Sequence, residues 1–249
     1  MQNNISDNLI LKYLKTPKKV VVFDEVTSTN DVIKELDADL VVALSQTAGR
    51  GTNNRKFFSP SGGVYLSFKI KNLKLPLVKL SLITPYFAVV TAKAIEKVAG
   101  VKCKIKWVND VLINGKKVAG ILTENTISND KIDTVIIGVG INVERQNFPN
   151  FILNTPTSIE EETNRCIDVN RLIAELSLGI DGVLENVESK NFISYYKNNF
   201  YLKNKKIKLK SCGISYTGVV KGVNDNLALL LDIGSQTKEF ISHEQLEIL

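Results

Sequence analysis

An Asn-Gly dipeptide between two apolar runs constrains the fold of this chain more than any other feature. Asn114 and Gly115 separate the run 111–113 from the run 116–122. Asn-Gly tolerates the positive φ angles that a two-residue type I′ turn requires, so the two runs are predicted to pair as an antiparallel hairpin. Such a hairpin fixes the register of two buried strands and places Lys117 just after the turn.

Further patterns predict a body that combines strands and helices. Strands are expected at 19–23, 40–46, 64–69, 103–107 and 134–143, and a turn at 129–130. Helices are expected from residue 28, over 77–98 (bent or restarted at Pro85), over 169–184 and around 191–199, with a mobile loop over 145–165. Short strands follow at 206–210, 216–220, 227–231 and 239–249. The chain is therefore predicted to be an α+β body with a small appended β-barrel.

A basic, glycine-rich loop follows the second predicted strand. Gly49 and Gly51 flank Arg50, so backbone N–H groups can converge without obstruction by Cβ atoms, and the arginine adds a fork of donors. This chemistry suits a phosphate or a carboxylate. Basic glycine-containing loops are also ordinary surface turns, and both interpretations stay open on the residues alone.

Ser28 and Asp31 form a capping-box-like pair at the start of the first predicted helix. Ser28 and Thr29 therefore either cap this helix or present their hydroxyls to a polar ligand at its N-terminus, and the two roles are compatible. By itself, Lys117 after the turn would be interpreted as a lysine in solvent. Asn109 and Asp110 before the hairpin would be interpreted as ordinary turn residues.

Composition excludes several kinds of active site. The one histidine, His243, is expected at the surface on a terminal strand, which excludes Ser/His/Asp and Cys/His catalysis and histidine-built metal sites. The three cysteines are far apart, as in reduced proteins. A net charge of +6 from scattered residues favours an anionic ligand over nucleic acid. We find no signal peptide and no apolar run of membrane-spanning length, so a cytoplasmic protein without membrane association is expected.

Four segments, in this order, resemble the biotin protein ligases. They are residues 28–30 (STN), 46–51 with 59–67 (QTAGRG and SPSGGVYLS), 106–110 with 115–124 (KWVND and GKKVAGILTE), and 138–143 (GVGINV). The resemblance spans about residues 20–249. It implies a class II synthetase-like, biotin/lipoyl ligase-like catalytic domain in residues 1–200, with helices packed on a mixed sheet. It also implies an SH3-like barrel in residues 201–249.

The resemblance implies a two-step reaction that uses biotin, ATP and Mg²⁺. The biotin carboxylate attacks the α-phosphate of ATP, which gives biotinyl-5′-AMP and pyrophosphate. A specific lysine of a biotin carboxyl carrier domain, in acetyl-CoA carboxylase or a related enzyme, then forms an amide and releases AMP. Because charge builds at phosphorus, fixed cations and N–H donors are the main requirement and no histidine base is needed.

The same resemblance assigns roles to individual residues. Biotin binding is assigned to Ser28, Thr29, Asn30, Gln46, Gly49, Arg50, Gly51, Thr52, Lys117, Gly120 and Gly138. ATP or adenylate binding is assigned to Arg50, Arg55, Phe57, Asn109, Lys117 and Asn142, and catalysis to Arg50, Asp110 and Lys117. The ligands of the metal ion are not identified.

The chain departs from the family pattern at four places. Thr52 stands where many members carry a second arginine, and Asn53 and Asn54 replace basic or glycine positions. We therefore expect the adenylate to be held less tightly than in members with the full motif. Phe57 replaces a common tryptophan, so adenine stacking should persist on a smaller ring, and Val108 replaces a proline.

Two other functions stay open: lipoate attachment, because lipoyl ligases share this fold and mechanism, and a non-catalytic biotin-binding module. Few residues precede the first predicted strand, so we expect a monofunctional ligase without a winged-helix domain and without DNA binding. Exposed strand edges leave a homodimer open as well.

Overall fold

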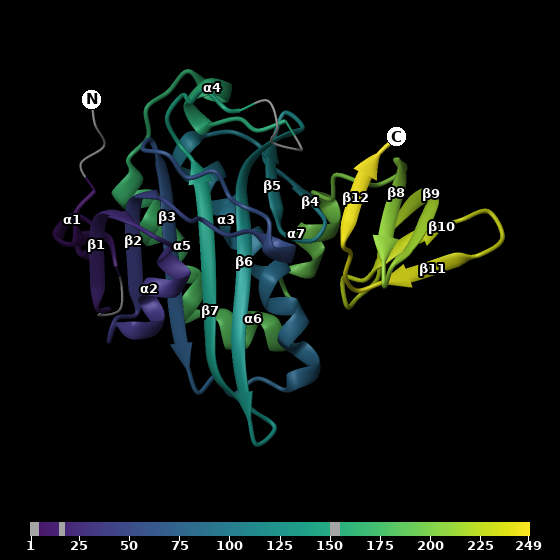
Figure 1. Ribbon diagram of the computed structural model, residues 1–249, viewed down its shortest axis with the longest axis horizontal. Coiled ribbons are helices and arrows are strands. Elements are labelled where there is room, and N and C mark those ends of the chain that lie inside the picture. The colour runs from purple at the N-terminus through teal and green to yellow at the C-terminus, as the bar shows by residue number, and fades with distance from the viewer. Residues whose placement is uncertain (1–4, 15–17, 150–154) are drawn as a thin grey trace.

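The computed structural model describes residues 5–14, 18–149 and 155–249, which form two β-sheets, one of them covered by helices (Figure 1). Residues 1–4 and 15–17 of the predicted catalytic domain lie outside the described residues, as do residues 150–154 of the predicted loop.

The larger sheet is mixed, as predicted. Its strands are β1 Val20–Val26, β2 Leu40–Gln46, β3 Gly63–Lys71, β4 Lys104–Lys106, β5 Asp110–Ile113, β6 Lys116–Ser128 and β7 Lys131–Asn142, in the order β1-β2-β3-β7-β6-β5-β4. β1 and β2 are parallel, and the other described neighbours are antiparallel. Asn114 and Gly115 have φ angles of 50° and 79° between β5 and β6. The predicted Asn-Gly hairpin is therefore confirmed.

Helices lie on both faces of this sheet (Figure 1). The main core packs α3 Ile83–Ala99, α5 Val169–Asp181, α6 Val183–Ser189 and α7 Ile193–Asn198 on one face. On the other face, α2 Thr29–Glu35 packs Ile33 against Val41 and Ile136 in a smaller cluster. The buried face of α2 explains why its polar N-terminus points along the sheet surface.

The stretch Leu77–Ala99 combines the 3₁₀ helix η2 Leu77–Leu82 with α3. By length and composition this stretch could cross a membrane, so the prediction that no run reaches that length is wrong. However, 61% of its most apolar window is buried within the protein, because α3 is the central helix on the sheet. Its composition is that of a core helix.

The smaller sheet is antiparallel and forms the C-terminal domain. Its strands are β8 Lys206–Ser211, β9 Ile214–Val223, β10 Leu229–Asp232, β11 Thr237–Phe240 and β12 Gln245–Ile248, in the order β11-β10-β9-β8-β12. Ile207, Leu209 and Leu229 are fully buried in a core that continues into the larger body. The predicted small β-domain is present. The boundary between residues 200 and 201 stays a prediction.

Several element boundaries differ from the sequence-based prediction. β1 continues to Val26, and α1 Asp7–Tyr13 was not predicted. The break before the long helix falls at Ile83 and not at Pro85, because proline in a first helical turn removes an N–H that would have no intrahelical partner. The predicted loop contains α4 Ile159–Thr163, and Gly182 divides the predicted helix 169–184 into α5 and α6.

Candidate active site

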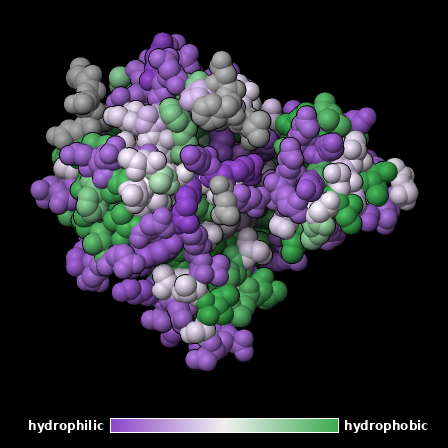
Figure 2. Space-filling model, in the orientation of Figure 1, coloured by the Kyte–Doolittle hydropathy of each residue, from purple (hydrophilic) through white to green (hydrophobic). Residues whose placement is uncertain are grey.

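A pocket of about 920 Å³ opens between the larger sheet, the glycine-rich loop (residues 49–57) and the C-terminal domain. In Figure 1 this loop crosses in front of β7 and β6, and in Figure 2 hydrophilic residues gather over the same part of the surface. Every predicted site residue lines the pocket: Ser28, Thr29, Asn30, Gln46, Gly49, Arg50, Gly51, Thr52, Arg55, Phe57, Asn109, Asp110, Lys117, Gly120, Gly138 and Asn142. Their contacts with substrates stay predictions.

A hydrogen-bonded group of polar side chains forms one end of the pocket. Thr29 and Asn30, at the start of α2, are 4% and 3% exposed. Oε1 of Gln46, the last residue of β2, accepts from the N–H of Thr29 at 2.8 Å and from its hydroxyl at 3.2 Å. Nε2 of Gln46 donates to Oγ of Ser59 at 3.0 Å. These contacts fix the orientation of the Gln46 carboxamide at the pocket wall.

Two strand residues that lie in the family segments, but to which no role was assigned, complete this polar end. Ser67 on β3 donates to Oδ1 of Asn30 at 2.5 Å, and its Oγ lies 2.8 Å from Oγ1 of Thr29. Glu124 on β6 accepts from Nδ2 of Asn30 at 2.8 Å. Asn30 lies directly over Gly138, where a Cβ atom would overlap Oδ1 of Asn30. The bare backbone of β7 therefore allows this packing.

The predicted capping box at α2 is wrong. Ser28 occupies the N-cap position, but its side chain makes no capping hydrogen bond and is buried at the pocket wall. Asp31 instead pairs with Lys34 at 3.2 Å and with Arg50 at 2.5 Å. The ligand-facing interpretation of Ser28 therefore agrees with its position.

Arg50, in the glycine-rich loop, is engaged by carboxylates of the protein. Its Nη2 lies 2.5 Å from Oδ1 of Asp31 and 3.2 Å from Oε2 of Glu124. The Arg50 side chain is 38% exposed and lines the pocket. A contact between Arg50 and the carboxylate or phosphate of a substrate stays a prediction.

Lys117 is the second residue of β6, and its side chain extends into the pocket. Its Nζ lies 2.5 Å from Oδ1 of Asp110 and 5.6 Å from the ring centroid of Phe57, and its side chain is 22% exposed. Its backbone N–H and C=O are bonded to the segment 155–157 at 3.0 and 2.8 Å. The strand and this segment together hold the ammonium group in the pocket, so the interpretation of a fully solvated lysine is wrong.

Two carboxamides near Lys117 are tied to backbone carbonyls. Nδ2 of Asn109 donates to the carbonyl of Ile121 at 2.8 Å, and Nδ2 of Asn142 donates to the carbonyl of Thr157 at 2.9 Å. Phe57 lies against Gly140, where a Cβ atom would come within 2.5 Å of its ring. The phenyl ring thus rests on bare backbone of β7, beside both asparagines in the same pocket.

His243 does not lie on the surface of a terminal strand, so that prediction is wrong. It precedes β12, is partly buried and lines the pocket, with its ring centroid 5.1 Å from that of Trp107. Burial, and then the charge of Arg55, lower the pKa of His243 to about 4, so its imidazole is neutral at pH 7. Burial also lowers the pKa of Lys106, which is 7% exposed, while the nearby Asp110 raises it.

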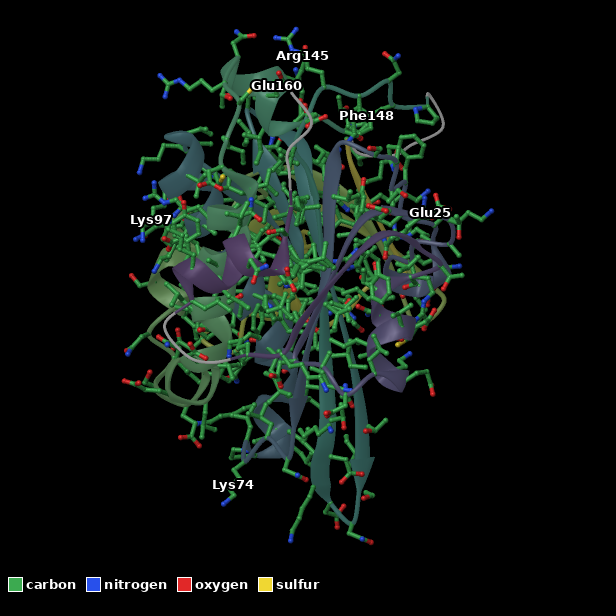
Figure 3. All side chains as sticks on the ribbon, turned by 90° about the vertical axis from the view of Figure 1, so that its left-hand side faces the viewer. Glu25, Lys74, Lys97, Arg145, Phe148 and Glu160 are labelled. Atoms are coloured by element: carbon green, nitrogen blue, oxygen red, sulfur yellow. The ribbon has the colours of Figure 1, made fainter. Side chains whose placement is uncertain are left out.

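No motif in the sequence indicates that the C-terminal domain contributes to the wall of the pocket. Leu246 joins His243 there, far along the chain from the four motifs. Glu25 of β1 and Phe148 also line the pocket, and the ring of Phe148 packs edge-on against that of Phe58 at 6.3 Å. Figure 3 shows Glu25 and Phe148 on one side of the molecule and Lys97 of α3 on the opposite side.

The pocket suits anionic ligands better than a protein-held metal ion. Arg55, Lys106 and Lys117 line it together with Asp110. Among the described residues, no group of three or more His, Cys, Asp or Glu side chains could hold a metal ion. Mg²⁺ is commonly held by one or two carboxylates and by the phosphates of its nucleotide, which is compatible with this arrangement.

Known proteins are similar to this chain in both sequence and fold. Residues 22–142 match the biotin/lipoate A/B protein ligase family. "Bifunctional ligase/repressor BirA" of Bacillus subtilis is 32% identical over 253 residues, which cover 96% of this chain and 78% of that protein. The chain belongs to the biotin protein ligase family. Its predicted fold and ligase class are thereby confirmed.

Other members of the family agree with this assignment. The biotin protein ligase from Aquifex aeolicus in complex with biotin and ATP superposes with a TM-score of 0.79 at 28% identity, covering 93% of this chain and 99% of that chain. "Biotin--[acetyl-CoA-carboxylase] ligase" of Mycobacterium tuberculosis is 25% identical over 211 residues, covering 82% of this chain and 76% of that protein.

Proposed function

We propose that this biotin protein ligase activates biotin with ATP to biotinyl-5′-AMP and transfers the biotinyl group to a specific lysine of a biotin carboxyl carrier domain. One observation carries the proposal: the four family segments, separated in sequence, line one pocket that is hydrogen-bonding at one end and cationic at the other. The neutral polar head group of biotin needs the first environment, and the reacting carboxylate and phosphates need the second one beside it.

The polar end fits the ureido head of biotin. Ser28, Thr29 and Gln46 present hydroxyl and carboxamide groups that their neighbours hold in place. A buried site that pairs each polar group of its ligand discriminates strongly against analogues that lack them, because its own groups would otherwise stay unpaired. This end therefore supports biotin over lipoate, whose dithiolane ring offers no ureido group.

The cationic end fits the carboxylate and phosphates that react. Lys117 is held against Asp110 at 2.5 Å, so its ammonium group is oriented before any substrate arrives. An oriented cation stabilises charge that develops at phosphorus without reorganisation during the reaction. Arg55 adds positive charge from the glycine-rich loop. Arg50, which lies against Asp31 and Glu124 beside the polar end, is proposed to reach the same carboxylate or phosphate. Mg²⁺ bound with ATP would neutralise phosphate charge, with Asp110 as a candidate carboxylate ligand.

Phe57, Asn109 and Asn142 are proposed to hold the adenosine part. The phenyl ring rests on Gly140 and offers a flat apolar face, and the two asparagines flank the same space. We further propose a cytoplasmic enzyme whose acceptor is the carrier domain of acetyl-CoA carboxylase or a related enzyme. A homodimer through an open sheet edge stays a proposal as well.

Purified protein with Mg-ATP should release pyrophosphate on addition of biotin and much less on addition of lipoate. Mass spectrometry of an acceptor domain should then show the addition of one biotinyl group. Pyrophosphate release with lipoate alone would favour lipoate attachment. No release with either acid would favour a non-catalytic biotin-binding module and refute the proposed activity.

A further inference from the structure

The glycine-rich loop is hydrogen-bonded to the C-terminal domain through Asn53. Asn53 lies in the 3₁₀ turn Thr52–Asn54, and its Nδ2 donates to the carbonyls of His243 and Glu244, each at 3.1 Å. Its backbone is left-handed, with φ 56° and ψ 41°. Asparagine adopts this conformation more readily than most residues, so one residue supplies both the turn and the contact.

The segment that receives these bonds is itself fixed on the C-terminal domain. The backbone N–H of Glu244 donates to the carbonyl of Lys210 at 2.8 Å. The His243 ring packs on Trp107, whose indole N–H donates to the buried carbonyl of Leu227 at 2.9 Å. The two carbonyls that accept from Asn53 therefore belong to a segment that is bonded to β8 and packed on Trp107.

The contact positions the charged part of the loop. Arg55 follows Asn53 by two residues, and its guanidinium donates to the carbonyl and the hydroxyl of Thr52 at 3.2 and 3.0 Å. Its charge acts on both Lys106 and His243, so it faces the cationic end of the pocket. Within the loop, the N–H of Gly51 bonds to the carbonyl of Arg55 at 2.7 Å. These bonds tie Arg55 to the turn that contains Asn53.

We propose that Asn53 is a positioning residue that latches the glycine-rich loop to the C-terminal domain and so retains the adenylate. This proposal rests on the proposed function. Asn53 itself does not line the pocket, so its loss should speed escape of the intermediate more than it slows its formation.

Two substitutions break the latch in different ways. Asn53→Asp keeps the size of the side chain but replaces the donor with an acceptor that faces two carbonyl oxygens. Asn53→Gly removes the donor and keeps the left-handed backbone accessible. Asn129→Gly is the matched control, because Asn129 is exposed, also left-handed at φ 48°, and lies at the turn between β6 and β7.

Each protein is incubated with labelled biotin and Mg-ATP, and the release rate of biotinyl-AMP is measured after a chase with unlabelled biotin. Both Asn53 variants should release it about tenfold faster than the wild type, while the first burst of pyrophosphate and Tm stay near the wild-type values. Asn129→Gly should match the wild type. Hydrogen exchange of loop amides 49–57 in the ligand-free protein should also rise in the Asn53 variants alone.

Release rates and loop exchange that stay at wild-type values in both Asn53 variants would overturn the latch. An equal effect of Asn129→Gly would overturn it too, because the change would then reflect loss of an asparagine in a turn. A wild-type protein that forms no pyrophosphate would refute the proposed function instead. The exchange measurement would still decide the latch in that case, because it needs no substrate.

Discussion

The partly buried imidazole of His243 should make stability fall with acid in a predictable pH window. An unfolded histidine has a pKa of about 6.5, and burial with the charge of Arg55 lowers it to about 4 in the folded protein. Between these values the unfolded chain binds a proton that the folded protein excludes, so stability is lost as the pH falls from about 6.5 towards 4.

The size of this loss follows from the difference between the two pKa values. About 2.5 pKa units at ~1.4 kcal/mol each correspond to roughly 3 kcal/mol when the loss is complete, and about 2 kcal/mol of it is reached by pH 5. Lys106, Arg55 and Asp110 also face the imidazole. Lys106 and Arg55 oppose its protonation and Asp110 favours it, and all three remain in a His243→Gln variant.

The assay is urea unfolding of the wild type and of His243→Gln between pH 8 and 5. Trp107 is the single tryptophan, so its fluorescence reports on the surroundings of His243 directly. The free energy of unfolding of the wild type should fall by about 2 kcal/mol more than that of the variant over this range. Above pH 7 the free energies of unfolding of the two proteins should change with pH in parallel. Parallel losses down to pH 5 would refute the reasoning, whatever the absolute stabilities are.

Three substitutions in the pocket carry further predictions. Lys117→Ala should lower biotin-dependent ATP–pyrophosphate exchange by at least ~100-fold, and near-normal exchange would assign the charge to another group. Gly138→Ala should weaken biotin binding by about tenfold or more in calorimetry, because the new Cβ overlaps Oδ1 of Asn30, and an unchanged Kd would show that Asn30 moves freely. Thr52→Arg should reduce biotinylation of an unrelated lysine-rich protein through slower adenylate release, and equal labelling would contradict the role given to this position.

Local signals in the sequence predicted most of the sheet. Residues 40–46 form a strand with the predicted bounds, and the Asn-Gly hairpin forms where it was predicted, because strand period and turn chemistry depend on neighbouring residues alone. The short helices α1 and α4 were missed, since a helix of one or two turns carries too little periodic pattern to separate it from a polar loop.

The candidate site was predicted less completely, for a different physical reason. The motif residues line the pocket as a set, yet no role in the site was assigned to Ser67 and Glu124, which end two of the family segments, and His243 was expected at the surface. Each meets its partner only through tertiary packing: Glu124 lies 94 positions from Asn30 in the chain, and Ser67 lies 37 positions away. Contacts of that kind leave no pattern in a single sequence.

The placement of Leu246 in the wall of the pocket bears on how this enzyme is made. A ribosome delivers the chain from its first residue to its last, and the motifs emerge long before the strand that carries Leu246. Until that strand pairs with β8, a nascent chain holds the binding groups of the enzyme without the enclosure around them. The pocket wall is therefore complete only after the strand that carries Leu246 has been made and has paired with β8.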